Sequence, residues 1–142
     1  MKKQTEKKLK KFFKTKEINQ ENVINHVLST CTPLENKIVK ERIYLSNSGN
    51  SVYKKRYKTV SEENHLNYQK VYHVYQKCLR KLRHPYRTKI IKDFVEELVL
   101  FVDKENIDDK SVCLYIKNHF LLEDFIYREI YGESLCDFFL YR

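Results

Sequence analysis

The clearest hydrophobic pattern in the chain lies in residues 69–85, where apolar and basic side chains recur with the period of an α-helix. One face of this helix carries seven residues that can be buried: Val71, Tyr72, Val74, Tyr75, Cys78, Leu79 and Leu82. The opposite face carries a cationic stripe of six residues: Lys70, His73, Lys77, Arg80, Lys81 and His84. Like charges three and four residues apart disfavour an isolated helix, so the cationic stripe predicts an anionic partner.

A second long helical pattern follows this helix. The first helix should end at His84, because a residue before proline avoids helical backbone angles, and the second should begin near Thr88. Its apolar residues cover close to half of its circumference: Ile90, Ile91, Phe94, Val95, Leu98, Val99, Phe101 and Val102. We therefore expect it to be the most buried element. The short connection predicts an antiparallel helix hairpin that holds the cationic stripe outward.

Several other boundaries have local signals in the N-terminal half. Asn19 can cap a short helix, and Thr32-Pro-Leu-Glu35 supplies both a capping box and a proline at the first helical position. Residues 46–51 are a loop by composition. Residues 52–58 fit either a short strand or an extended basic loop, and we favour the loop. Ser61 is predicted to cap the long helix that carries the cationic stripe.

The C-terminal half predicts three shorter helices. Asp108 can cap the first, whose apolar positions drift out of phase near His119, so we expect a break there. The next helix should end at Gly132, and Ser134 can start a final apolar turn. The aromatic residues of that turn predict that it closes the core or inserts into a partner.

Composition supports an all-α fold. The chain has 142 residues, 42% of them hydrophobic, which suits one domain with a modest core. Two glycines and two prolines leave little material for the turns of β-rich architectures. We predict a small helical domain over residues 17–142, built around the helix hairpin, with a basic N-terminal arm over residues 1–16.

Charge is distributed unevenly along the chain, whose formal net charge is +9. Residues 1–16 hold eight lysines and one acid, residues 51–92 hold twelve bases and two acids, and residues 93–142 hold five bases and twelve acids. This separation predicts a basic surface for a polyanion. The acidic C-terminal half would stay in solvent or dock on basic protein.

The N-terminal arm allows several interpretations. Leu9, Phe12 and Phe13 recur at helical spacing among its lysines. A mitochondrial presequence is disfavoured by Glu6 and by the lack of arginine. A membrane-surface helix would have only three apolar anchors. The composition is ordinary for a nucleic-acid-binding arm, and the alternative is a disordered, solvated tail.

The sequence contains no pattern typical of an enzyme, a metal site or a cofactor site. Only Gly49 and Gly132 are available, so a glycine-rich phosphate loop is excluded, and the five histidines lack metal-ligand spacing. The four cysteines are widely spaced: Cys31, Cys78, Cys113 and Cys136. We expect reduced, buried thiols in a cytoplasmic protein, with no metal, no cofactor and no catalytic residue.

The basic surface is predicted to bind RNA. Basic side chains neutralise phosphates, and the interleaved Tyr53, Tyr57, Tyr72 and Tyr86 can stack on unpaired bases, which folded RNA presents more often than DNA. The expected contact residues are Lys2, Lys3, Lys7, Lys8, Lys10, Lys11, Lys54, Lys55, Arg56, Tyr57, Lys58, Lys70, His73, Lys77, Arg80, Lys81, Arg83, His84, Arg87 and Lys89.

One family resemblance covers about half of the chain. The segment VYQKCLRKLRHPYR, followed by FVEELVLF and Ile107-Asp-Asp109, resembles the LYR-motif mitochondrial adaptors. The resemblance implies a three-helix protein that binds an acyl carrier protein and assists iron–sulfur or respiratory-complex assembly. The tripeptide Val74-Tyr75-Gln76 stands where the family has Leu-Tyr-Arg, so the arginine is replaced by glutamine.

Together these patterns predict an RNA-binding protein of a ribonucleoprotein, with ribosomal RNA and ribosomal proteins as its partners. It would be a lineage-specific ribosomal protein or a hibernation factor that occupies a functional site and keeps ribosomes idle, and it would act by occupancy. The alternatives are a helical assembly adaptor like the LYR-motif proteins and a peripheral membrane protein that uses its N-terminal helix.

Overall fold

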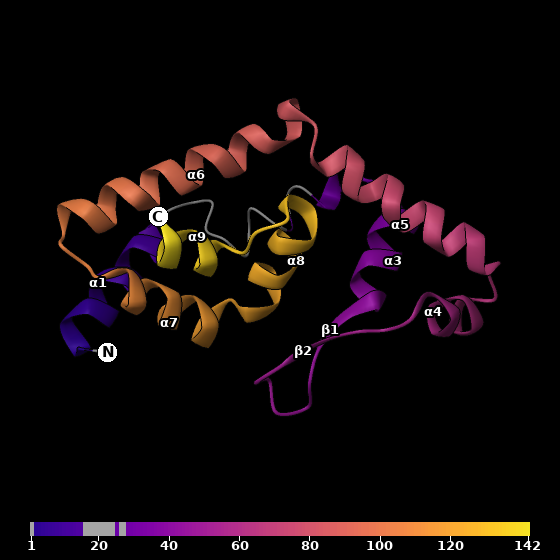
Figure 1. The fold of residues 1–142 in the computed structure, drawn as a ribbon, viewed down its shortest axis with the longest axis horizontal. Coiled ribbons are helices and arrows are strands. Elements are labelled where there is room, and N and C mark those ends of the chain that lie inside the picture. Colours follow the sequence, from indigo (N-terminus) through magenta and orange to yellow (C-terminus); the bar gives the residue numbers. More distant parts are fainter. Residues whose placement is uncertain (1, 16–24, 26–27) are drawn as a thin grey trace.

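The computed structural model describes residues 2–15, 25 and 28–142. Within these residues it contains eight helices and one two-stranded antiparallel sheet, which confirms the all-α prediction (Figure 1). The helix cap predicted at Asn19 lies outside the described residues. None of the helices in the described ranges is long and apolar enough to cross a bilayer.

From α3 onward, short connections join the elements along the chain. The helices are α1 (Lys3–Thr15), α3 (Pro33–Arg42), α4 (Tyr57–Asn64), α5 (Tyr68–Leu82), α6 (Pro85–Lys104), α7 (Asp109–His119), α8 (Leu121–Tyr131) and α9 (Leu135–Tyr141). The strands are β1 (Ile43–Leu45) and β2 (Val52–Lys54), paired with Ile43 opposite Lys54 and Leu45 opposite Val52.

The capping box predicted at the start of α3 is present. Thr32 Oγ1 accepts a hydrogen bond from the Glu35 backbone N–H at 3.2 Å, and Glu35 Oε1 accepts one from the Thr32 N–H at 2.9 Å. The helix then ends at Arg42, and the chain continues as β1. The loop favoured over residues 52–58 is wrong: the turn of residues 46–51 brings 52–54 back onto β1 as a strand, and Tyr57 begins α4.

The predicted cap of the cationic helix is also wrong. Ser61 is buried within α4, which ends at His65 in the left-handed conformation, with φ of 54°. Asn67 caps α5 instead, because its side chain accepts a hydrogen bond from the Gln69 N–H at 2.8 Å. An additional short helix therefore precedes α5.

The helix ends predicted in the C-terminal half are confirmed. Asp108 Oδ2 accepts a hydrogen bond from the Ser111 N–H at 3.1 Å, and α7 ends at His119, where a break was expected. Gly132 ends α8 with φ of 82°, a conformation that glycine adopts without a Cβ clash. Ser134 Oγ accepts from the Asp137 N–H at 3.0 Å and so starts α9.

The helix hairpin predicted for α5 and α6 is not formed. The two helices diverge from the turn at His84, so that α5 packs on α3 while α6 runs toward α1 (Figure 1). His84 has extended backbone angles and Pro85 is the first residue of α6, so the chain leaves the turn in a new direction. The helix α6 is not the most buried element either, since Leu100 is 70% exposed.

The N-terminal helix, which we expected as a basic arm beside the helical domain, contributes side chains to the core. Leu9, Phe12 and Phe13 are buried, and the Phe12 ring stacks on Phe101 with ring centroids 4.7 Å apart. Phe13 stacks in the same way on Phe120, at 5.0 Å. The lysines of α1 remain on its outer side, so the helix is amphipathic with its apolar face turned inward.

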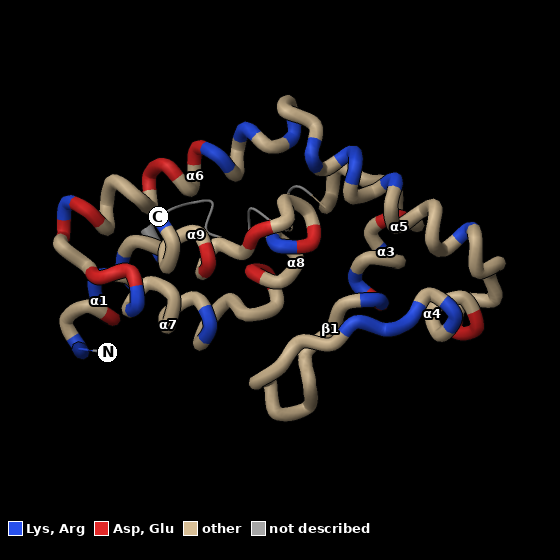
Figure 2. Tube along the Cα trace, in the orientation of Figure 1, with Lys and Arg blue, Asp and Glu red and all other residues tan. Residues whose placement is uncertain are grey.

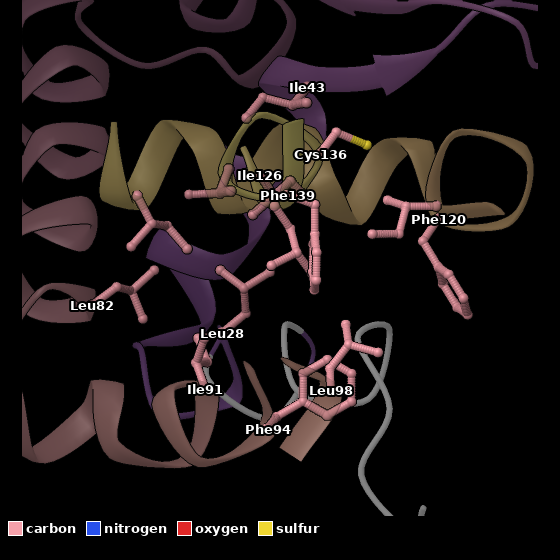
Figure 3. Close-up of a cluster of buried hydrophobic side chains, with 14 of the residues drawn as sticks. Leu28, Ile43, Leu82, Ile91, Phe94, Leu98, Phe120, Ile126, Cys136 and Phe139 are labelled. Atoms are coloured by element: carbon pink, nitrogen blue, oxygen red, sulfur yellow. The ribbon is translucent and has the colours of Figure 1, made fainter. Parts of the chain in front are cut away.

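The C-terminal helix α9 closes the core. It packs against α7, and Phe139 is fully buried between residues from several helices. Figure 3 shows Phe139 beside Ile126 of α8, with Leu28 and Leu98 nearby. The four cysteines are buried and free, as expected, and no group of three or more metal-ligating side chains occurs in the part of the chain that the structure describes.

Candidate nucleic-acid interface

The outer side of α5 carries the cationic stripe. Lys70, His73, Lys77, Arg80 and His84 are exposed, while the opposite face is buried against the core. Figure 2 shows that basic residues follow the C-terminal part of α5 and the start of α6 along one edge of the molecule. The apolar face differs from the prediction at one position, because Tyr72 is 41% exposed.

Tyr86 stands at the centre of this basic edge, with 87% of its surface exposed. A concavity of about 650 Å³ lies on one side, lined by Lys77, Arg80, Lys81, His84, Tyr86 and Arg87. A second concavity, of about 720 Å³, is lined by Thr30, Pro85, Tyr86, Arg87, Thr88, Lys89, Ile90, Lys92 and Asp93. We call this region the Tyr86 ridge: the Tyr86 side chain with the two concavities that share it.

The cations of the Tyr86 ridge have unused binding capacity. The Arg87 Nη1 atom is buried and has no hydrogen-bond partner in the structure. Within the described residues, no ion pair joins Lys77, Arg80 or Lys89 to an acid. An anion in either concavity would therefore meet positive side chains that are not neutralised internally, and Asp93 is the one acid in the lining of the two.

Two residues predicted to contact RNA instead hold helices together. Lys81 Nζ lies 2.8 Å from Glu35 Oε1 of α3, and Glu35 is only 4% exposed. Burial raises the pKa of Glu35, but the hydrogen bonds from Lys81 and Thr32 together lower it by more than burial raises it. The pKa of Glu35 therefore lies below its ordinary value. Arg83 donates from Nε to the Ile130 carbonyl and from Nη2 to the Glu129 carbonyl at 3.2 Å.

The predicted basic run Lys54–Lys58 lies elsewhere, which divides the surface that we expected to be continuous. Lys54 Nζ is 2.6 Å from a carboxylate oxygen of Glu129, and Lys55 Nζ is 2.9 Å from one of Glu63. Figure 2 places this run on the edge opposite the turn between α5 and α6. This run lies away from the Tyr86 ridge, because α4 packs on α3 and α5 while the strands pack on α3 and α8 (Figure 1).

Tyr57 is not available for stacking on a base. Its ring packs against Tyr72 with centroids 5.2 Å apart, and the Arg42 guanidinium lies 4.0 Å from its centroid. Arg42 also lies 4.5 Å from the Tyr75 ring centroid, so the three side chains form a partly buried cation–π cluster. Arg56 and Lys58 beside it remain exposed.

The predicted lysines of α1 form a third, separate basic patch. Lys2, Lys3, Lys7, Lys10 and Lys11 are exposed at the end of the molecule far from the Tyr86 ridge (Figure 2). Lys8 is 3.3 Å from Glu105 and is therefore partly neutralised. The structure thus brings Lys77, Arg80, His84, Arg87 and Lys89 together, and it separates them from the cations of α1 and of residues 54–58.

Tyr86, which was expected to stack on unpaired bases, lies at the centre of the ridge, whereas Lys92, which lines the second concavity, is absent from the contact residues expected from sequence. Tyr86 is the second residue of α6, three positions before Lys89, so the two lie on one helical face. In the structure α6 starts at Pro85, whereas we expected its start near Thr88. With that start, Tyr86 belongs to the helix and lies on the side away from the buried Ile91.

No protein-family model, curated protein sequence or solved structure matches this chain. The resemblance to LYR-motif adaptors therefore has no family match behind it, and the eight helices of the described residues differ from the three-helix fold that it implied.

Proposed function

We propose that this protein binds RNA through the Tyr86 ridge and acts by occupying its site, without catalysis. The observation that carries the proposal is the position of Tyr86, an almost fully exposed aromatic ring between two concavities with a cationic lining. Basic groups give affinity through phosphate neutralisation and counterion release, and an exposed ring gives stacking on bases. A surface selected only for solubility needs neither the ring nor the clustering of one charge sign.

The distribution of acids supports a partner that contains both RNA and protein. Apart from Asp93, the acidic residues of α6 and those of α8 and α9 lie away from the Tyr86 ridge (Figure 2). Some are neutralised internally, as in the pairs of Arg142 with Asp103 at 2.7 Å and with Asp109 at 2.9 Å. The remaining acids suit contact with basic protein. The ribosome is the ribonucleoprotein in which we propose this arrangement acts, either as a constituent protein or as a factor that keeps the particle idle.

Charge reversal tests the RNA-binding surface. The variant with Lys77→Glu and Arg80→Glu removes two exposed, unpaired cations, and it should weaken binding to a labelled structured RNA about tenfold or more in fluorescence anisotropy. The variant with Lys110→Glu and Lys117→Glu makes the same charge change on exposed positions of α7 and should keep affinity within about twofold, because α7 lies away from the ridge. Equal losses in both variants would contradict a localised site.

Sedimentation tests whether the protein associates with ribosomal particles. The native protein in cell extract should co-migrate with ribosomal particles in a low-salt gradient and be released by high salt, because phosphate contacts weaken steeply with ionic strength. Migration as free protein at low salt would refute the ribosomal assignment. The variant with Lys77→Glu and Arg80→Glu should migrate free at both salt concentrations.

A further inference from the structure

Tyr86 is 87% exposed although it lies in the first turn of α6. No ring contact or cation–π contact engages Tyr86 within the described residues. Its backbone is nevertheless fixed, since the Tyr86 N–H donates to His84 Nδ1 at 3.3 Å and Thr88 Oγ1 donates to the Pro85 carbonyl at 3.1 Å. The backbone that carries the ring is thus fixed, and the ring itself has no aromatic or cationic partner among the described residues.

Both concavities of the Tyr86 ridge include Tyr86 and Arg87 in their lining. A ligand that fills the two must therefore pass over the Tyr86 ring. Each side offers its own cations, Lys77 and Arg80 in the first concavity and Lys89 and Lys92 in the second. The order along the ridge is cation, aromatic ring, cation. A polynucleotide strand has the same order of phosphate, base and phosphate.

From this correspondence we infer that the ligand of the Tyr86 ridge is an unpaired RNA strand. One base stacks on the Tyr86 ring while the phosphates on its two sides occupy the two concavities. The inference rests on the proposed RNA binding and narrows it to single-stranded segments, such as loops, bulges and ends. A base inside a continuous duplex has both of its faces covered by neighbouring bases and cannot reach the ring.

Arg87 is positioned to serve either phosphate. The Arg87 side chain lines both concavities, and guanidinium donors suit bidentate contact with phosphate oxygens. An acidic protein or a lipid headgroup would use the same cations but would have no need for the aromatic ring. The contribution of Tyr86 therefore distinguishes an unpaired strand from these other anions.

The chain contains no tryptophan, so a single introduced indole reports on the ridge alone. In the variant Tyr86→Trp, titration with a single-stranded oligonucleotide should quench the fluorescence strongly, because stacking brings the base onto the indole. Tyr141→Trp is the matched control, since Tyr141 is 80% exposed at the end of α9, away from the ridge. Heparin, a polyanion without bases, should compete for binding without quenching by stacking.

Affinity measurements provide the second test. Tyr86→Ala should weaken binding of a single-stranded RNA about tenfold, whereas Tyr86→Phe should keep the affinity of the native protein. The salt dependence should stay unchanged in Tyr86→Ala, while Arg80→Ala and Lys89→Ala should each reduce its logarithmic slope by about one unit. The native protein should also prefer the single strand over a duplex of equal length.

The outcomes separate this inference from the function on which it rests. The inference of an unpaired strand is wrong if two results occur together: Tyr86→Ala binds RNA like the native protein, and the native protein binds duplex and single strand equally. RNA binding at the ridge still stands in that case, provided that Lys77→Glu with Arg80→Glu abolishes it. If that double variant also binds normally, the proposed function itself fails.

Discussion

The Lys81 ammonium group lies 2.8 Å from Oε1 of Glu35 and so joins α5 to the capping box at the start of α3. The same carboxylate accepts the Thr32 N–H, which makes Glu35 a shared acceptor for a helix cap and an ion pair. Glu35 is 4% exposed, and its second oxygen, Oε2, has no partner. Its charge is therefore compensated mainly by Lys81.

Removing the Lys81 charge should destabilise the protein. We expect Lys81→Met to lower the free energy of unfolding by about 2 kcal/mol, because it leaves a buried carboxylate without its cation; the partial exposure of Lys81 keeps the loss below that of a fully buried pair. Urea unfolding followed by circular dichroism measures the change. Glu35→Gln in the same chain should recover part of the loss, since the neutral amide oxygen still accepts the Thr32 N–H. An unchanged unfolding midpoint in Lys81→Met would show that the pair contributes nothing.

The lowered pKa of Glu35 predicts how stability depends on pH. Burial raises this pKa, and the hydrogen bonds from Lys81 and Thr32 lower it to below its ordinary value of 4.5. A lowered folded-state pKa contributes stability that is present above pH 4.5 and is lost as the pH falls through the folded-state value. The variant Glu35→Gln should therefore lose less stability than the native protein between pH 6 and pH 3. A parallel loss in both proteins would contradict this assignment.

Arg83 should contribute to stability and not to RNA binding, although it lies next to the cationic stripe. Its guanidinium donates to the Glu129 and Ile130 carbonyls at the C-terminal end of α8, where backbone acceptors lack helical partners. Arg83→Ala should lower the free energy of unfolding by about 2 kcal/mol while RNA affinity in anisotropy changes less than about twofold. A large loss of affinity in a well-folded Arg83→Ala protein would place this side chain in the RNA interface instead.

The sequence predicted helix ends better than helix packing. Caps depend on residues within one turn, so Thr32, Asp108 and Ser134 could be identified from their neighbours alone. The partner of an apolar face is not encoded locally, because hydrophobic burial has no direction. The face of α6 was therefore expected against α5, whereas Phe94 packs on the ring of Phe12, with centroids 6.3 Å apart.

In the candidate site, too, local features were predictable from the sequence and contacts between distant residues were not. Its positive charge was predictable, because Lys77 and Arg80 stand at helical spacing beside the turn. Which cations remain free was not, because the acids that engage Lys54 and Lys81 come from distant positions in the chain, Glu129 and Glu35. Tyr86 was expected to stack on bases because it stands among the cations. Its place between two concavities was not predictable, because it depends on the start of α6, which lies three residues before the expected one.

The buried face of α1 distinguishes an integral helix from a detachable arm. Phe13 is 3% exposed and stacks on Tyr115 as well as Phe120, with the Tyr115 ring centroid 5.3 Å away. Phe13→Ala should lower the free energy of unfolding by about 3 kcal/mol, measured by urea denaturation. Lys10→Ala, an exposed substitution on the same helix, should change it by less than about 0.5 kcal/mol. Comparable small effects from both would mean that α1 docks only weakly.

The thiols of Cys31 and Cys78 lie 3.3 Å apart in the core, one just before the Thr32 cap and the other on the buried face of α5. Burial raises the pKa of the Cys78 thiol well above its ordinary value of 9.0, and the neighbouring Cys31 raises it further. Because the thiolate is the reactive form, we expect the thiols of the native protein to react with an aromatic disulfide reagent at pH 8 far more slowly than a free cysteine. Unfolding in guanidinium should release all four thiols at once.

Cys31 is 9% exposed and Cys78 is fully buried, so mass spectrometry of partly labelled protein should find label on Cys31 before Cys78. Labelling of Cys78 first, at a rate near that of a free thiol, would contradict the packing of α5 on α3.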